Sequence, residues 1–276
     1  MKIKNTSIIG FIFILLSSCS NYTTLIKSRD YEQKYNAAKQ YFADKKYTRA
    51  SMLLMEVIAV LKGTDKGEES LFLLAMCEYN AHNYDIASDY FKKYYDSYPN
   101  GVYVEDARYY SGLALYWTAP DSKLDQTETL LAITEFQNFL DYYPETRLKD
   151  KTQKFIFELQ DKLIQKEYNN AKLYYNLGDY FGNSTMGGSN YQACIITAEN
   201  ALKDYPYTTL REAFSILLVR AKFYLAEQSV EAKKEERYQN AIDECYGFSN
   251  EFSDSKYSKE TKKMLEISTN AIKKYK

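Results

Sequence analysis

The chain has 276 residues, of which 36 are basic and 37 are acidic, so its formal net charge is -1. This balance gives no positive field that would attract nucleic acid, and we expect no nucleic-acid partner. Its 10 glycines and 4 prolines are few for a β-rich or loop-rich protein, which favours helices.

The N-terminus has the order of a secretory signal. Lys2 and Lys4 precede an apolar run over residues 8–16, and two serines lead to Cys19. The apolar run is much shorter than the roughly 20 residues with which a helix crosses a bilayer. We therefore predict that residues 1–18 are a signal peptide that is cleaved off.

The residues at the predicted cleavage site resemble a bacterial lipobox, because a leucine and two serines stand directly before Cys19. The resemblance implies that this thiol carries a lipid anchor and that residues 19–29 are a lipidated tether. No Asp follows Cys19, and by similarity to known sorting rules this favours the outer membrane. We expect the protein to face the periplasm.

The following part of the chain, residues 30–276, repeats one helical pattern. In its complete form a Tyr is followed by a small residue, two apolar residues and a closing Pro, as in Tyr84, Ala87, Phe91, Tyr94 and Pro99. Offsets of three and four place the first four on one face of a helix, and the Pro cannot continue that helix. Further copies, complete or partial, begin at Tyr47, Ala132, Tyr191 and Tyr238.

A second helical stretch, with a small residue and then an aromatic residue, precedes each copy. The small residues of the first three stretches, Ala38, Ala75 and Gly112, are 37 residues apart. Such helix pairs are typical of the tetratricopeptide repeat. We predict an all-α fold, an α-solenoid of five tetratricopeptide-type helix-turn-helix repeats. The repeats are expected at residues 31–67, 68–104, 105–150, 155–208 and 210–256, with a C-terminal capping helix at 257–275.

Residues that could support catalysis or metal binding do not converge in the sequence. The single histidine, His82, stands in a predicted turn, where a solvated side chain is expected. Cys77, Cys194 and Cys245 stand among apolar residues at helical spacing and are predicted to be buried thiols rather than disulfide partners. No P-loop, paired CxxC or HExxH motif occurs. We expect a binding protein without metal or cofactor, not an enzyme.

The first helix of each predicted pair would line the concave face of the solenoid, where ligands have most access. Counted from the small residues of the first three repeats, its outward residues form a mostly aromatic strip. Tyr and Met offer large and adaptable contact surfaces, so we predict that the strip binds an extended peptide with aromatic side chains. The alternative is that the superhelix buries many of these side chains between helices. The strip consists of Tyr35, Lys39, Phe42, Phe72, Met76, Tyr79, Tyr109, Leu113 and Tyr116.

A recurring tail follows the repeats, at residues 98–103, 143–148, 205–210 and, more loosely, 252–257. Together with the lipobox and the five repeats, it resembles the BamD family of outer-membrane lipoproteins over essentially the whole chain. The resemblance implies a scaffold of the machinery that inserts β-barrels into the outer membrane. Its N-terminal repeats would receive unfolded outer-membrane proteins, and its C-terminal repeats would dock onto the barrel subunit BamA.

Two other hypotheses remain open from the sequence. A glycan-capturing lipoprotein would also use a helical repeat fold and aromatic side chains, although such chains are usually much longer. An adaptor of cell-wall assembly would share both the fold and the compartment.

Overall fold

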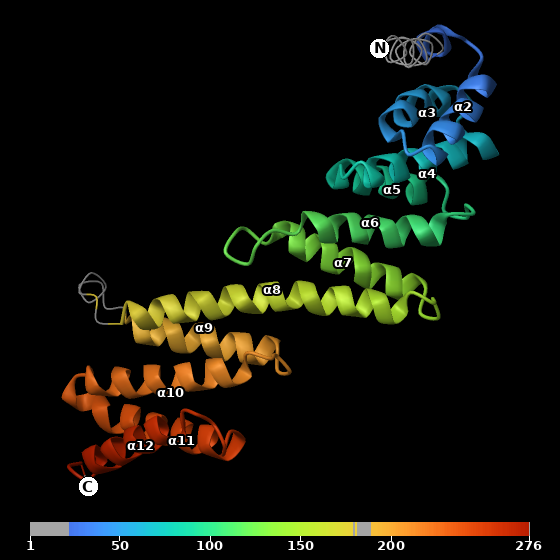
Figure 1. Cartoon of the computed structure of the whole chain (residues 1–276). Helices are drawn as coiled ribbons and strands as arrows, with labels where there is room; N and C mark the ends of the chain where they lie inside the picture. Colours follow the sequence, from blue (N-terminus) through green and yellow to red (C-terminus); the bar gives the residue numbers. More distant parts are fainter. Residues whose placement is uncertain (1–21, 179, 181–188, 276) are drawn as a thin grey trace, which may run out of the picture. The chain divides into compact units, whose positions relative to one another are not determined.

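The computed structural model describes residues 22–178, 180 and 189–275. All regular secondary structure in this described part is helical, and helices that follow one another pack together (Figure 1). The predicted all-α repeat fold is therefore confirmed. Residues 22–27 form a short helical segment. The longer helices are α2 (Tyr31–Ala43), α3 (Tyr47–Leu61), α4 (Asp65–Asn80), α5 (Tyr84–Ser97), α6 (Val104–Thr118), α7 (Thr127–Tyr142), α8 (Lys149–Asn176), α9 (Asn190–Asp204), α10 (Arg211–Glu227), α11 (Glu231–Glu251) and α12 (Ser258–Ile272).

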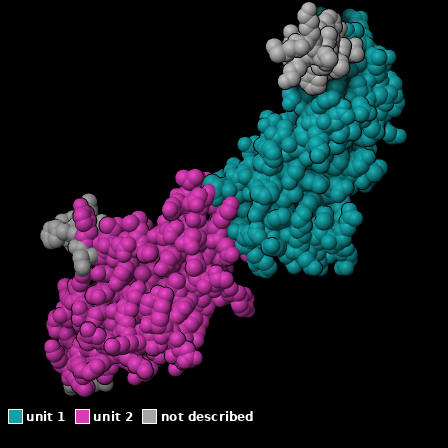
Figure 2. Space-filling view, in the orientation of Figure 1, with its two compact units in different colours: residues 1–120, 127–159 teal, residues 121–126, 160–276 magenta. Residues whose placement is uncertain are grey.

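The chain divides into two compact units (Figure 2). The first unit comprises residues 1–120 and 127–159, and the second comprises residues 121–126 and 160–276. Helices α2 to α7 belong to the first unit and α9 to α12 to the second, while α8 contributes to both. Among the described helices, none combines the length and the apolar character needed to cross a membrane.

Two helices begin earlier than the expected repeat boundaries. Helix α4 starts at Asp65, within the residues assigned to the first repeat, because the Thr64 hydroxyl accepts a hydrogen bond from the Gly67 N–H at 3.1 Å and caps it. Helix α8 starts at Lys149, within the residues assigned to the third repeat, and is 28 residues long.

The small residues of the repeat pattern lie where paired helices approach most closely. Ala38, Ala75 and Ala87 are fully buried. At Gly112 an added Cβ would lie 2.7 Å from Cδ1 of Phe136, so the ring already fills the space that a methyl group would need. In the third repeat, the small Gly112 on α6 thus leaves room for the large Phe136 ring on α7.

The closing proline marks the end of α5, α7 and α9, and α11 ends in the same register without a proline. Helix α11 ends two residues before Ser253, in the register in which α5 ends before Pro99. Both helices close with a hydrogen bond of 2.8 Å from an aromatic cap residue to the fourth carbonyl before it, Tyr98 to Tyr94 and Phe252 to Phe248. In three of the tails a hydroxyl then accepts a hydrogen bond from the N–H two residues later and fixes the turn. These bonds run from Leu148 to Thr146 (3.2 Å), from Leu210 to Thr208 (3.1 Å) and from Tyr257 to Ser255 (3.0 Å).

The predictions for His82 and the cysteines are confirmed. His82 is exposed in a turn with φ of 64°, and its Nδ1 lies 2.7 Å from the Tyr84 hydroxyl. Cys77, Cys194 and Cys245 are buried and free. Burial raises the pKa of each thiol to about 12, so all three stay protonated and unreactive at neutral pH.

Candidate peptide-binding face

The predicted strip lies on α2, α4 and α6, the first helices of the three helix pairs in the first unit. Its members differ in exposure, because the interior positions are covered by the neighbouring helices. Only the partly covered and exposed members leave surface that a ligand could reach. Lys39 is exposed, Phe42, Phe72, Met76, Tyr79 and Tyr116 are half-buried, and Tyr35, Tyr109 and Leu113 are buried.

The half-buried members of the strip on α4 are held by other aromatic rings. Phe72 stacks on Tyr103 with ring centroids 4.5 Å apart and planes 8° from parallel. Tyr79 meets Tyr84 and Tyr110 at centroid distances of 5.4 and 5.3 Å. Such aromatic pairs contribute about 0.5–1.5 kcal/mol each beyond the area they bury. The strip on α4 is therefore a stiff aromatic surface that needs little ordering when a ligand binds.

The Glu69 carboxylate, which is not among the predicted strip residues, joins α2 to α4. The Tyr35 hydroxyl donates to Glu69, and the Lys39 ammonium lies 2.7 Å from the same carboxylate. Burial, together with the hydrogen bond to Glu69, raises the pKa of Tyr35, and the Glu69 hydrogen bond raises the pKa of Lys39. The ion pair neutralises the one charged member of the strip. Glu69 follows Tyr35 by 34 residues, whereas these repeats are 37 residues apart, so the repeat offsets did not select it.

Trp117 extends the strip at the end of α6. Its indole Nε1 donates to the Tyr79 hydroxyl at 3.2 Å, and its ring stacks on Tyr84 with centroids 6.2 Å apart. The side chain is 53% exposed, and it is the single tryptophan of the chain. Counting offsets from Gly112 missed it, because it stands one position beyond the last strip residue that was counted.

Tyr116, the strip residue beside Trp117, joins α6 to α8. Its ring lies 4.6 Å from the ring of Phe155, and its hydroxyl donates to Glu158 at 2.5 Å. Burial, followed by the hydrogen bond to Glu158, raises the pKa of Tyr116 to about 12. The hydroxyl therefore remains a donor at any physiological pH.

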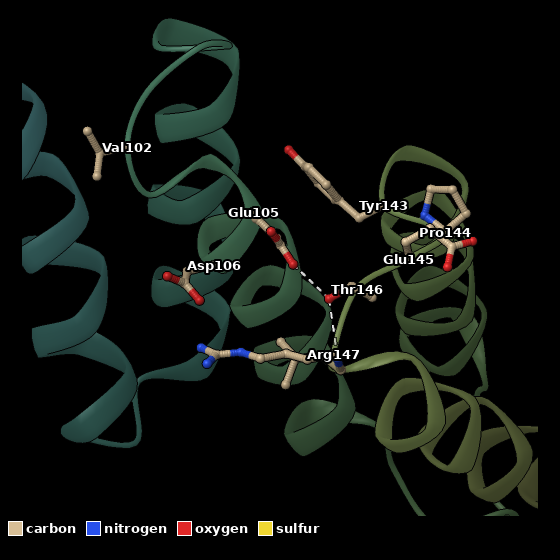
Figure 3. A pocket seen from close by; sticks show the side chains of 9 residues that line it. Val102, Glu105, Asp106, Tyr143, Pro144, Glu145, Thr146 and Arg147 are labelled. Atoms are coloured by element: carbon tan, nitrogen blue, oxygen red, sulfur yellow. Dashed lines mark hydrogen bonds between the residues drawn. The ribbon is translucent and has the colours of Figure 1, made fainter.

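A polar pocket of about 560 Å³ lies where the tail after α7 runs beside the start of α6 (Figure 3). The Glu105 carboxylate accepts a hydrogen bond of 2.7 Å from the Thr146 hydroxyl, and the Arg147 side chain points toward Asp106. No strip residue lines this pocket, so it is separate from the aromatic face. Its lining residues are Val102, Glu105, Asp106, Tyr143, Pro144, Glu145, Thr146, Arg147 and Leu148.

The second unit carries fixed ion pairs beside its aromatic side chains. Arg220 donates two hydrogen bonds of 2.7 Å to Glu260, which joins α10 to α12. Lys222 lies 2.8 Å from Glu199 and 2.7 Å from Glu244, and it borders a polar pocket of about 430 Å³ between α9, α10 and α11.

Comparison with known proteins gives one family. The family described as YfiO, outer membrane lipoprotein, matches residues 27–217, from the residues just before α2 into α10. The match includes every strip residue, while Cys19 stands before it and also lies outside the described residues. No curated protein matches the chain.

Proposed function

The chain belongs to the YfiO family of outer membrane lipoproteins, the BamD type, and from this premise we propose that it is a scaffold of a β-barrel assembly machinery. In this role the first unit receives unfolded outer-membrane proteins on the aromatic face of α2, α4 and α6. The second unit docks onto a BamA-like barrel subunit, and a lipid on Cys19 holds the protein at the outer membrane.

The observation that carries the client-binding part is the neutral, half-buried aromatic face. Phe72 and Tyr79 are held by ring contacts, Met76 lies between them on the same helix, and Trp117 adds an exposed ring. An unfolded β-strand with alternating apolar side chains matches such a surface without charge pairing. Met and Tyr also tolerate different client sequences.

Peptide binding can be followed through the fluorescence of Trp117, because it is the single tryptophan and is in contact with the strip. The probe is a synthetic peptide with the sequence of a C-terminal barrel strand that ends in an aromatic residue. We expect Phe42→Ser combined with Met76→Ser to weaken binding about tenfold, which corresponds to about 1.4 kcal/mol.

The matched control is Met55→Ser combined with Ile86→Ser. These side chains are 46% and 49% exposed on α3 and α5, the second helices of the same pairs, so they carry a similar loss of apolar surface away from the strip. Equal affinities for the strip variant and the control would rule out the aromatic face as the receptor. The helical circular-dichroism signal of both variants shows that they are folded.

The docking part is tested by purifying a tagged full-length chain that keeps Cys19 from gently solubilised outer membranes. Recovery of a β-barrel protein with periplasmic domains in near-equal amount, lost on Arg220→Glu, would support docking through the second unit. A nutrient transporter or a cell-wall enzyme in its place would favour the glycan-capture or cell-wall hypothesis and contradict the proposal.

A further inference from the structure

The short helical segment at residues 22–27 is packed onto the first repeat. Leu25 and Ile26 pack against the apolar cluster formed by α2, α3 and α4. The Tyr22 ring meets the ring of Tyr41 edge-on at 5.5 Å, and the Arg49 guanidinium lies 5.1 Å from the Tyr22 ring centroid. This part of the predicted tether is thus attached to the folded unit along its length.

A buried lysine fixes the other end of the segment. Lys34 on α2 is only 1% exposed, and its ammonium donates to the Ile26 carbonyl at 2.8 Å and pairs with Glu56 on α3. The last carbonyls of a helix lack partners within the helix, and a cation placed there is stabilised by the helix dipole. Lys34 therefore joins the segment, α2 and α3 at one point.

The segment begins very close to the predicted anchor. Cys19 stands three residues before Tyr22, and at most about 3.6 Å per residue separates positions along an extended chain, so the two Cα atoms are within about 11 Å. A lipid-bearing cysteine lies at the level of the phospholipid headgroups. The N-terminal end of the first unit must then lie close to the bilayer surface.

The surface beside the segment has the composition that an interfacial contact needs. Met52 and Met55 on α3 are 49% and 46% exposed, and the Tyr22 hydroxyl lies 3.5 Å from the Met52 sulfur. Lys27 and Arg29 are exposed on the segment and just after it. Apolar side chains flanked by basic ones bind the headgroup region of anionic membranes.

The acidic groups near this surface are already engaged. Glu56 is paired with Lys34, and the Asp30 carboxylate caps α2 by accepting from the Gln33 N–H at 2.9 Å. Neither carboxylate needs a cation from the basic residues, which leaves these side chains to meet lipid phosphates.

We propose that residues 22–29, together with Met52 and Met55, form a membrane-contact surface that lies on the phospholipid bilayer. The docked segment makes the anchor a short, fixed link, so lipid attachment sets the orientation of the first unit toward the membrane. This inference rests on the lipidation of Cys19 that the proposed function includes.

The test uses the full-length lipidated chain in vesicles of phosphatidylethanolamine and phosphatidylglycerol with nitroxide-labelled lipid. Met52→Cys and Met55→Cys are each labelled with a fluorophore, and the three buried thiols stay unlabelled because their pKa values are about 12. The matched control is Leu131→Cys on α7, a side chain in the same unit that is 49% exposed. We expect quenching by about half or more at residues 52 and 55, as for groups within about 5–10 Å of the headgroup boundary, and none at residue 131.

A second variant tests the role of the docked segment. Lys34→Met removes the ammonium that links the segment to α2 and α3 and leaves the lipid in place. We expect it to abolish quenching at residue 55 without reducing the fraction of protein that floats with the vesicles. Lys92→Met is the control, because Lys92 is in the same unit and exposed on α5. If Lys34→Met fails to fold by circular dichroism, the two labelled positions in the parent chain still decide the proposal.

The outcomes separate the inference from the proposed function. Protein that floats with vesicles but shows no quenching at residues 52 and 55 overturns the membrane-contact surface and leaves the lipid anchor intact. Protein that does not float overturns the anchor, and the membrane-contact surface fails with it. Peptide binding to the aromatic face is measured without vesicles and stays independent of both.

Discussion

In the first unit the links between successive first helices combine phenol hydroxyls with lysine ion pairs, whereas in the second unit the link from α10 to α12 is made by a guanidinium. In the first unit, Tyr35 donates to Glu69 between α2 and α4, and Tyr116 donates to Glu158 between α6 and α8. In the second, Arg220 holds Glu260 between α10 and α12.

This difference shows that the repeat geometry requires a link at these places but not a particular chemistry. A phenol brings an apolar ring with its hydroxyl, so the links of the first unit also build an aromatic surface. A guanidinium or ammonium brings a charge that stays partly in water, so the links of the second unit build a polar one. The same fold can thus carry links that build an aromatic surface in one unit and links that build a polar surface in the other.

The largest effect on stability is expected when a buried phenol is removed from the core of the first unit. Tyr94 is fully buried, donates to Glu68 at 2.6 Å and accepts from the Tyr103 N–H at 3.0 Å. We expect Tyr94→Ala to lower the free energy of unfolding by about 3–5 kcal/mol, measured by urea denaturation. Hydrogen exchange should accelerate in α4 to α6 and stay unchanged in α9 to α12.

The matched control is Tyr246→Ala in the second unit, where the side chain is 54% exposed and a change within about 0.5 kcal/mol is expected. Equal acceleration of exchange in both units of the Tyr94→Ala variant would show that they unfold together. It would contradict the expectation that the first unit is destabilised without the second.

A smaller effect is expected from removing a central cation of the second unit. Lys222 is 18% exposed and lies between Glu199 and Glu244, so Lys222→Met leaves two carboxylates without their common partner. We expect a loss of about 1–2 kcal/mol, less than for a fully buried pair because Glu199 is half exposed. Added salt should recover part of this loss, since it screens the two carboxylates.

Lys262→Met provides the comparison, because Lys262 is exposed on α12. A loss in Lys222→Met no greater than in Lys262→Met would mean that the charged links of the second unit contribute nothing to its stability.

The smallest expected effect is a pH dependence of the stability that the Tyr116 hydroxyl contributes to the first unit. The pKa of Tyr116 is raised from 10.0 to about 12, so its phenol ionises more readily in the unfolded chain. The stability that Tyr116 contributes is fully present below pH 10 and is lost as the pH rises toward 12. Relative to Tyr116→Phe, the parent chain should lose roughly 1 kcal/mol at most over this range, because the hydroxyl is only partly shielded from solvent.

Urea midpoints of both proteins at pH 9 and pH 11 measure this difference. A constant difference between the two proteins across this range would contradict a linking role for the Tyr116 hydroxyl.

Much of the fold follows from local patterns. The offsets from Tyr84 to Tyr94 predict a helix face, and Ala87, Phe91 and Tyr94 are indeed fully buried. Local composition also predicts the buried cysteines and the exposed His82. The closing prolines also predicted the ends of α5, α7 and α9, and α11 ends in the same register although Ser253 stands in the place of the proline.

The candidate site was only partly predictable. Offsets from Ala75 select Phe72 and Tyr79, but they cannot tell that Tyr35 is 6% exposed and Tyr109 is 3% exposed, since the cover comes from neighbouring repeats. Glu69 was missed because its role depends on Tyr35, 34 residues away. Trp117 was missed because it stands one position beyond the counted offsets.

By itself the sequence determined the helix pairs, the five-repeat arrangement and the resemblance to an outer-membrane lipoprotein family, because these depend on spacing within one repeat and on short motifs. Only the tertiary structure decided which aromatic side chains stay open to a ligand and which are covered. It also decided that residues 22–27 are packed against the first repeat through Tyr22 and Lys34. Burial and long-range hydrogen bonds depend on residues a full repeat apart, and no local pattern encodes them.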